Sequence, residues 1–90
     1  MRAEMKIPGG KLLQVDVTVK DGIIEDIHFY GDFFLHPEEK IEELENALTG
    51  RNLSEIDNII TSVLAEAEMA GISPDDFSGI IKLALGERNA

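Results

Sequence analysis

The sequence lacks cysteine, and this absence removes several classes of function. Without a thiol there can be no disulfide, no cysteine ligand for zinc or an iron–sulfur cluster, and no cysteine nucleophile. No stretch approaches the roughly 20 apolar residues that a helix needs to span a membrane. The N-terminus, MRAEMKIPGG, also lacks the apolar segment of a secretory signal. These absences together predict a cytoplasmic protein with no membrane partner.

Basic residues are scarce: eight lysines and arginines face eighteen aspartates and glutamates, for a formal net charge of −10. Binding to nucleic acid depends on clustered Lys and Arg that neutralise phosphates, so we expect no nucleic-acid partner. The charge is also uneven. Residues 1–22 carry four bases and three acids, whereas residues 23–90 carry four bases and fifteen acids. Any anionic ligand is therefore expected near the N-terminal end.

The chain is short. Its ninety residues are enough for one small domain, which we expect to span residues 1–90. A chain of this size buries roughly two-thirds of the surface that its unfolded form exposes. That leaves room for one hydrophobic core and none for a deep cleft between two domains.

The first third of the chain alternates between apolar and polar residues, as a strand with one buried face does. The clearest case is residues 13–20, LQVDVTVK. Asp21 and Gly22 then predict a two-residue type I′ turn, and residues 23–31 predict the returning strand of the hairpin. Residues 3–7 predict a third, edge strand, which ends at a Pro-Gly-Gly turn.

The hairpin has a conflict of register. A regular two-residue turn would place Asp26 opposite Val17 and point a carboxylate into the core. One extra residue near Glu25 removes the conflict, because Val17 then pairs with Ile27. The sequence therefore predicts a β-bulge at this point.

After residue 35 the apolar residues recur at helical spacing and predict three helices, within residues 37–50, 54–71 and 73–86. Ser54 is expected to cap the second helix, with Asp57 three residues further on. The predicted fold class is therefore α+β. It has two layers, an antiparallel sheet of two or three strands followed by three helices packed on one of its faces.

Four of the five aromatic residues lie within residues 29–34, FYGDFF. Strand alternation assigns Phe29 to the core, and we expect Phe33 to join it. The same alternation turns Tyr30 and Phe34 away from the helices, and exposed aromatic rings beside a short loop indicate an interface. The alternative, that all four rings fill the core, is also compatible with the sequence.

No catalytic or metal-binding residue is predicted. The groups that could suggest a metal site are His28, Asp32, His36, Glu38 and Glu39. Strand alternation points His28 to solvent, and the spacing of the five residues matches no metal motif. The paired acids are expected on solvated helix faces, where nothing would prepare them for acid–base catalysis.

Several of these segments together resemble the C-terminal accessory domain of lipoate–protein ligases. They are KIPGG, VDVTVKDGIIEDIHFYGDFF, EEKIEELENALTG and IDNIITSVL, within residues 5–64. That family has a Gly-Gly turn, a valine-rich hairpin with a glycine at its tip, a GDFF stretch, and a helix ended by Leu-x-Gly. The matching positions are Gly9, Gly10, Gly22, Ile27, Phe29, Gly31, Asp32, Phe33, Phe34, Leu48 and Gly50.

The resemblance implies a fold similar to that of iron–sulfur scaffold proteins, in which a cysteine stands near the position of Gly31 and Asp32. Since this chain has no cysteine, the scaffold function is excluded. Ninety residues cannot hold the catalytic domain of a ligase, so the chain resembles the separate small subunit of a two-protein ligase.

In such a ligase the large catalytic subunit is implied to bind lipoate, ATP and magnesium. It makes lipoyl-adenylate and passes the lipoyl group to a lysine of a lipoyl-domain protein. The resemblance implies that the small subunit supports the adenylation step, forms a heterodimer with the large one, and binds no cofactor alone. The alternative function is that of a non-enzymatic interaction module that docks on another partner.

Two groups of candidate residues follow from this interpretation. The candidates for the partner interface are Tyr30, Gly31, Asp32 and Phe34. The candidates for facing the nucleotide are Lys6, Gly9, Gly10 and Lys11. Cations and accessible backbone N–H groups could stabilise charge on phosphates there. The competing interpretation is an ordinary turn between strands, flanked by solvated lysines of little energetic value.

Overall fold

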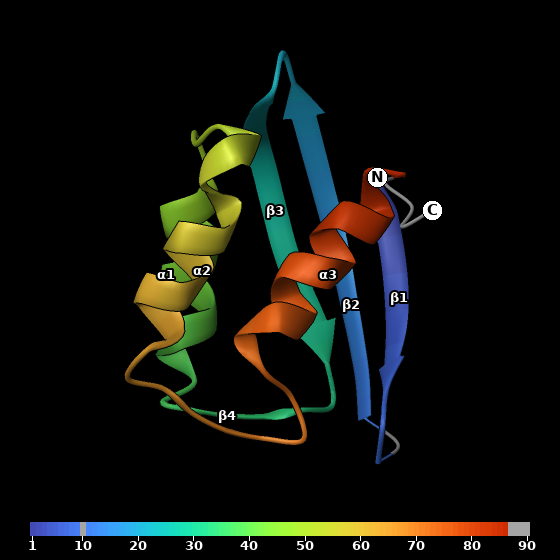
Figure 1. The fold of residues 1–90 in the computed structure, drawn as a ribbon, viewed down its shortest axis with the longest axis vertical. Coiled ribbons are helices and arrows are strands. Elements are labelled where there is room, and N and C mark those ends of the chain that lie inside the picture. Colours follow the sequence, from blue (N-terminus) through green and yellow to red (C-terminus); the bar gives the residue numbers. More distant parts are fainter. Residues whose placement is uncertain (10, 87–90) are drawn as a thin grey trace.

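The computed structural model describes residues 1–9 and 11–86, which form a layer of strands and a layer of helices (Figure 1). The elements in chain order are β1 (Arg2–Ile7), β2 (Lys11–Lys20), β3 (Ile23–Gly31), β4 (Phe34–His36), α1 (Glu39–Leu48), η1 (Leu53–Glu55), α2 (Ile56–Leu64), β5 (Glu68–Ala70) and α3 (Pro74–Ala84). Strands β1, β2 and β3 make one antiparallel sheet in that order. The predicted α+β fold is confirmed.

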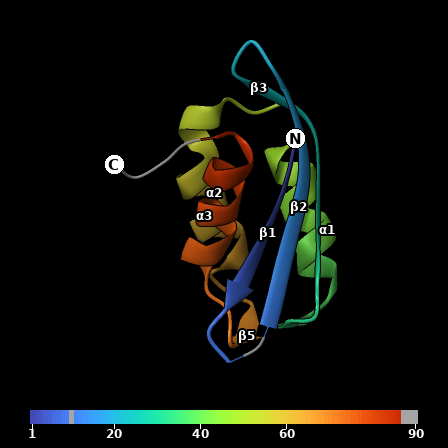
Figure 2. The same cartoon turned by 90° about the vertical axis from the view of Figure 1, so that its right-hand side faces the viewer.

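The helices gather on one face of this sheet (Figure 2). Helix α3 packs on β1 and β2, α1 packs on β3, and α2 packs against both other helices. In the described part of the chain no helix lies on the opposite face of the sheet, which we call the outer face. No described helix is long and apolar enough to cross a membrane.

The predicted hairpin and its bulge are confirmed. Asp21 and Gly22 have φ values of 54° and 77°, as a type I′ turn requires. Val17 pairs with Ile27, and the register shifts by one residue between there and the turn, which leaves Glu25 without a partner on β2. The extra residue keeps the carboxylates on the solvent side and the aliphatic side chains in the core.

Phe77 of α3 lies at the centre of the core and is fully buried. Its ring meets Phe29 and Phe33 edge to face, with centroids 5.1 and 5.7 Å apart. Phe29 and Phe33 both belong to the core as predicted: Phe29 is buried, and Phe33 is partly buried and packs against the core residues. Tyr30 and Phe34 are 54% and 51% exposed, so the alternative that all four rings fill the core is also wrong.

A second, two-stranded sheet was not predicted. Strands β4 and β5 pair antiparallel, with Leu35 opposite Met69. The second helix was expected to reach residue 71, but α2 ends at Leu64 so that β5 can form. Three-residue strands are too short to show a period in the sequence, and only the pairing and the burial of Leu35 define them.

The predicted cap of the second helix is also wrong. Asn52, not Ser54, accepts the capping hydrogen bond, from the Ser54 N–H at 2.9 Å. Oε2 of Glu55 accepts a hydrogen bond from the Asn52 N–H at 3.2 Å, which completes a capping box. The cause is the 3₁₀ turn η1, which starts the helical segment two residues earlier. The predicted start of the third helix at Ser73 is confirmed.

Truncating Phe29 should destabilise the fold much more than truncating Phe34. We expect Phe29→Ala to lower the free energy of unfolding by about 3–5 kcal/mol, because it removes a buried ring and leaves a cavity against Phe77. Phe34→Ala should stay within about 0.5 kcal/mol of the wild type, because half of that ring is already in water. Urea denaturation of both variants measures the difference, and equal losses would contradict this description of the core.

Candidate functional site

The two groups of candidate residues lie at the same end of the main sheet. Asp32 makes the connection: its N–H donates to the Leu12 carbonyl oxygen at 3.2 Å, and its Oδ1 accepts from the Leu12 N–H at 2.6 Å. The end of β3 is therefore bonded to the start of β2, next to Lys11. In Figure 1 this is the lower end of the molecule, where the β1–β2 turn and β4 lie.

Gly31 leaves no room for a side chain. A Cβ atom there would collide with the Leu12 carbonyl oxygen and would lie 2.8 Å from Cδ2 of Phe33. Gly31 and Asp32 thus hold the corner at the end of β3 together. Their proposed contact with a partner stays a prediction, and their structural role was not visible in the sequence.

The two exposed rings lie on either side of Gly31 and Asp32 in the sequence. Tyr30 lies on the outer face beside His28, with ring centroids 6.4 Å apart. Phe34 lies on β4, and its ring stacks on His36 with centroids 6.5 Å apart and planes inclined by 17°. A hollow of about 190 Å³ adjoins Phe34, and Phe33 and Ile41 contribute to its apolar lining. We call residues 30–36 the aromatic corner.

The candidates for facing the nucleotide form a strand end and a turn. Lys6 is exposed at the end of β1, and Gly9 is exposed in the turn with φ of 100°. Gly10 lies outside the described residues. Lys11 is half-buried, and its Cγ would lie 3.3 Å from a Cβ atom placed on Gly71. Within residues 1–9 and 11–86, neither lysine pairs with a carboxylate.

The structure does not bring the five possible metal ligands together. Nε2 of His28 lies 3.2 Å from Oδ1 of Asp26, and its Nδ1 lies 3.9 Å from Oε2 of Glu45. His36 instead stacks on Phe34 at the aromatic corner. Among the residues that the structure describes, no group of three or more His, Asp or Glu could hold a metal ion.

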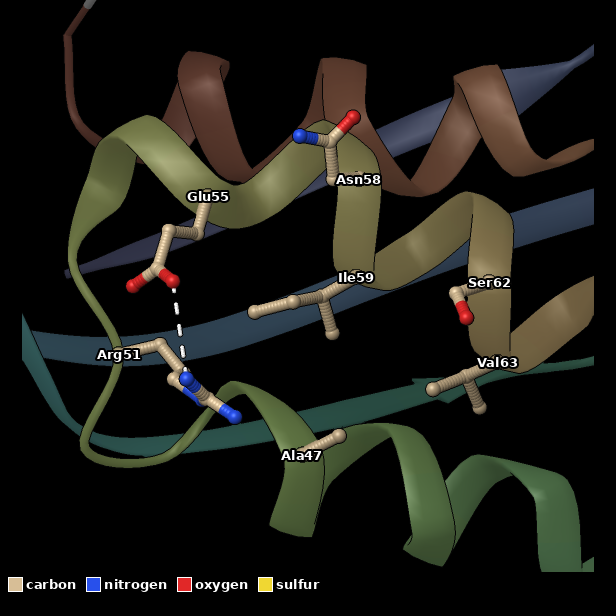
Figure 3. A pocket seen from close by; sticks show the side chains of 7 residues that line it. All are labelled: Ala47, Arg51, Glu55, Asn58, Ile59, Ser62 and Val63. Carbon is tan, nitrogen blue, oxygen red and sulfur yellow. Dashed lines mark ion pairs between the residues drawn. The ribbon is translucent and has the colours of Figure 1, made fainter.

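A groove between α1 and α2 was not anticipated from the sequence (Figure 3). It encloses about 440 Å³, and Ile59 and Val63 of α2 line it together with Ala47 of α1. An ion pair between Arg51 and Glu55, at 3.6 Å, lies at one end. Ile59 and Val63 are partly buried at the margin of the core. The apolar residues of α2 and its flanks (Ile56, Ile59, Ile60, Val63, Leu64 and Ala67) cover more of the helix than one buried face needs, and this width is the sequence signal that could have revealed the groove.

Comparison with known proteins gives consistent results. The family model for the bacterial lipoate protein ligase C-terminus matches residues 1–81. The lipoate-protein ligase A subunit 2 of Thermoplasma acidophilum is 36% identical over 67 residues, 73% of this chain and 71% of that protein. A solved structure of a bi-partite lipoate protein ligase and its E2 lipoyl domain from the same organism matches with a TM-score of 0.84. That match is 30% identical and covers 90% of this chain and 92% of the other.

A methyl group at Gly31 should loosen the aromatic corner. We expect Gly31→Ala to lower the free energy of unfolding by about 1–3 kcal/mol, because the new Cβ atom overlaps backbone that cannot move freely. The matched control is Gly79→Ala in α3, whose Cβ atom would meet only Met5 at 3.5 Å. The control should gain up to about 1 kcal/mol from helix propensity. Thermal and urea unfolding measure both, and equal shifts would show that the close approach at Gly31 is unimportant.

Proposed function

This chain belongs to the family of the bacterial lipoate protein ligase C-terminus, and we propose that it is the accessory subunit of a two-protein lipoate–protein ligase. It forms a heterodimer with a large catalytic chain and acts in the cytoplasm. The observation that carries the proposal is the similarity to the Thermoplasma acidophilum protein, which is itself named as the second subunit of such a ligase.

The proposed reaction has two steps, and both take place on the large chain. A carboxylate oxygen of lipoate attacks the α-phosphorus of ATP, pyrophosphate leaves with the electrons of the broken P–O bond, and lipoyl-adenylate forms. The Nζ amine of a lysine in a lipoyl-domain protein then attacks the acyl carbon, the bond from that carbon to the phosphate oxygen breaks, AMP leaves, and the nitrogen gives up a proton as the amide forms. Magnesium and ATP are bound by the large chain and not by this one.

In this proposal the accessory subunit acts by binding. A subunit that binds the adenylation-competent conformation of the large chain more tightly than other conformations raises the population of that conformation. It needs no nucleophile or general base of its own for this effect. The size of the effect is limited by the difference in its affinity for the two conformations.

The docking surface that fits this role is the aromatic corner with the adjoining outer face. Tyr30 and Phe34 expose about half of their rings, and Tyr is among the residues most enriched at the centres of interfaces. A hollow of about 250 Å³ lies beside Tyr30 on the outer face, and Glu4, Gln14 and Asp16 help to line it. An apolar ring with a polar rim is the usual arrangement of a protein–protein contact.

The lysines at the N-terminal end suit a position near the nucleotide. Negative charge builds on the phosphates during adenylation, and fixed cations with backbone N–H donors stabilise it. Lys6 and Lys11 provide the cations, and Gly9 provides a backbone N–H group. All three belong to residues 1–22, the part of the chain that is not strongly acidic. They lie at the same end of the sheet as the aromatic corner, so one docked partner can reach both.

The direct test measures lipoyl-adenylate formation by the large ligase chain with and without this chain. We expect the rate to rise at least about tenfold on addition, which corresponds to about 1.4 kcal/mol of barrier. The reaction is measured either by the formation of labelled adenylate from radiolabelled ATP or by the release of pyrophosphate. No increase would show that the chain is not an accessory subunit and would favour an interaction module for another partner.

Two variants of this chain sharpen that test. The double variant Tyr30→Ala/Phe34→Ala should need a higher concentration to give the same stimulation, because it removes the exposed rings. The matched control is Thr18→Ala, which truncates an exposed residue toward the other end of the outer face. It should stimulate as the wild type does. Equal behaviour of the double variant and the control would place the interface elsewhere.

Charge reversal of the two lysines should separate the half-reactions. At concentrations of this chain that saturate the large chain, so that weaker binding does not limit the rate, we expect Lys6→Glu and Lys11→Glu to slow adenylation by about tenfold, while transfer from preformed lipoyl-adenylate stays unchanged. Lys20→Glu, the same change at the far end of β2, is the control and should affect neither step. Equal loss in both steps would indicate a defect of assembly, and no loss in either would leave these lysines as solvated charges.

A further inference from the structure

The two edges of the main sheet differ in how far their backbone groups are hydrogen-bonded. The β3 edge is bonded to the chain's own segments. The Ile24 N–H donates to the Arg51 carbonyl at 2.9 Å, and the Gly50 N–H donates to the Ile24 carbonyl at 2.7 Å. Further along, the Phe29 N–H donates to Oε2 of Glu45 on α1 at 2.8 Å. This edge is therefore occupied at both ends of the strand.

The β1 edge has no such cover in the described part of the chain. Met1 exchanges two hydrogen bonds with Val17, at 2.6 and 2.7 Å. In an antiparallel ladder the bonded residues alternate, so Arg2, Glu4 and Lys6 turn their N–H and C=O groups away from β2. Within residues 1–9 and 11–86, no backbone group outside β1 and β2 bonds to these three. Figure 1 shows β1 as the outermost strand of the sheet.

We propose that this open edge accepts an extended segment of the large ligase chain, which adds a fourth strand to the sheet beside β1. The inference rests on the proposed function and specifies how the partner binds. Strand addition supplies a set of main-chain hydrogen bonds, and the alternate side chains supply the specificity.

The charges along the edge select the occupant. Arg2, Glu4 and Lys6 alternate positive, negative and positive. If a second copy paired along the whole strand, Glu4 would face Glu4 and Arg2 would face Lys6, and like charges directly opposite destabilise a sheet. A shift by two residues pairs opposite charges but leaves one of the three positions outside the ladder. A net charge of −10 on each copy opposes self-association further.

A segment that carries acidic, basic and acidic residues at alternate positions matches all three charges at once. Charged residues on an edge strand also discourage pairing with unrelated strands. The same three side chains can therefore keep the edge open in the free protein and reserve it for a complementary segment.

The open edge is continuous with the docking surface on the outer face. Glu4 pairs with Gln14 and Gln14 pairs with Tyr30, so these residues form one row across the sheet. The Gln14 amide donates to Oε1 of Glu4 at 2.6 Å. A strand beyond β1 would extend this row, roughly three strand spacings or about 14 Å from Tyr30. One partner can thus contact the ring and the edge together.

Amide hydrogen exchange resolved by NMR tests the proposal. The chain is compared alone and in complex with the purified large ligase chain. The amides of Arg2, Glu4 and Lys6 should exchange rapidly in the free chain and slow by at least about tenfold in the complex. The amides of Ala3 and Met5 are the internal control, because their bonds to β2 protect them in both states.

A proline variant tests the same bonds by affinity. Glu4→Pro removes one outward N–H group and no bond to β2, and edge strands tolerate proline when that group faces solvent. We expect it to weaken binding of the large chain by about tenfold or more. Glu4→Gln keeps the N–H group and removes only the charge, so it should weaken binding less. Circular dichroism checks that both variants fold. If Glu4→Pro does not fold, the exchange experiment on the wild-type chain alone decides whether the proposal stands.

The outcomes separate this inference from the proposed function. A complex that forms and stimulates adenylation with unchanged exchange at the three outward amides would overturn the strand addition and leave the function standing. The absence of any complex would overturn both. Protection of these amides in the free chain that grows with its concentration would assign the edge to a second copy, and would also overturn the proposal.

Discussion

The two hydrogen bonds between Asp32 and Leu12 fix where the chain leaves the sheet, and the rest of the fold depends on that exit. Because the end of β3 is bonded to the start of β2, the next residues must turn beneath the helices, where Phe33 meets Phe77. Leu35 is then buried in the small second sheet, which leads into α1. The backbones approach so closely at this exit that only glycine fits at position 31. The clustering of the aromatic residues follows: some rings fill the corner and the others are turned outward by it.

The features predicted correctly are those set by neighbouring residues. The alternation of β2, the Asp-Gly turn and the conflict between Val17 and Asp26 are all visible over a few positions, and together they locate the bulge at Glu25. The features missed depend on residues far apart in the chain. The pairing of Leu35 with Met69 joins segments more than thirty positions apart, and neither strand is long enough to show a period.

The same division holds for the candidate site. Strand alternation was sufficient to predict that Tyr30 and Phe34 are exposed, because it is a local property. It could not show that Lys6 and Lys11 lie at the same end of the sheet as these rings, which follows from the bonds of Asp32. The open edge of β1 was also beyond the sequence. It is recognised only by comparison with the edge of β3, where a side chain of α1, Glu45, accepts a hydrogen bond from the Phe29 N–H.

Charge is distributed unevenly between the helix layer and the strands β1 and β2. The acidic residues of α1 and of the start of α3 belong to the helix layer, whereas Arg2, Lys6, Lys11 and Lys20 belong to β1 and β2. A surface of clustered carboxylates raises the energy of nearby phosphates, and the effect decays over about 8 Å at physiological salt. In an assembly that binds ATP, the helix layer is therefore the side expected to face away from the nucleotide. In the complex that we propose, the outer face, the aromatic corner and the edge of β1 face the partner together. The hydrophobic core needs helices on only one face of the sheet, so within residues 1–9 and 11–86 the opposite face and the edge of β1 are left available for binding.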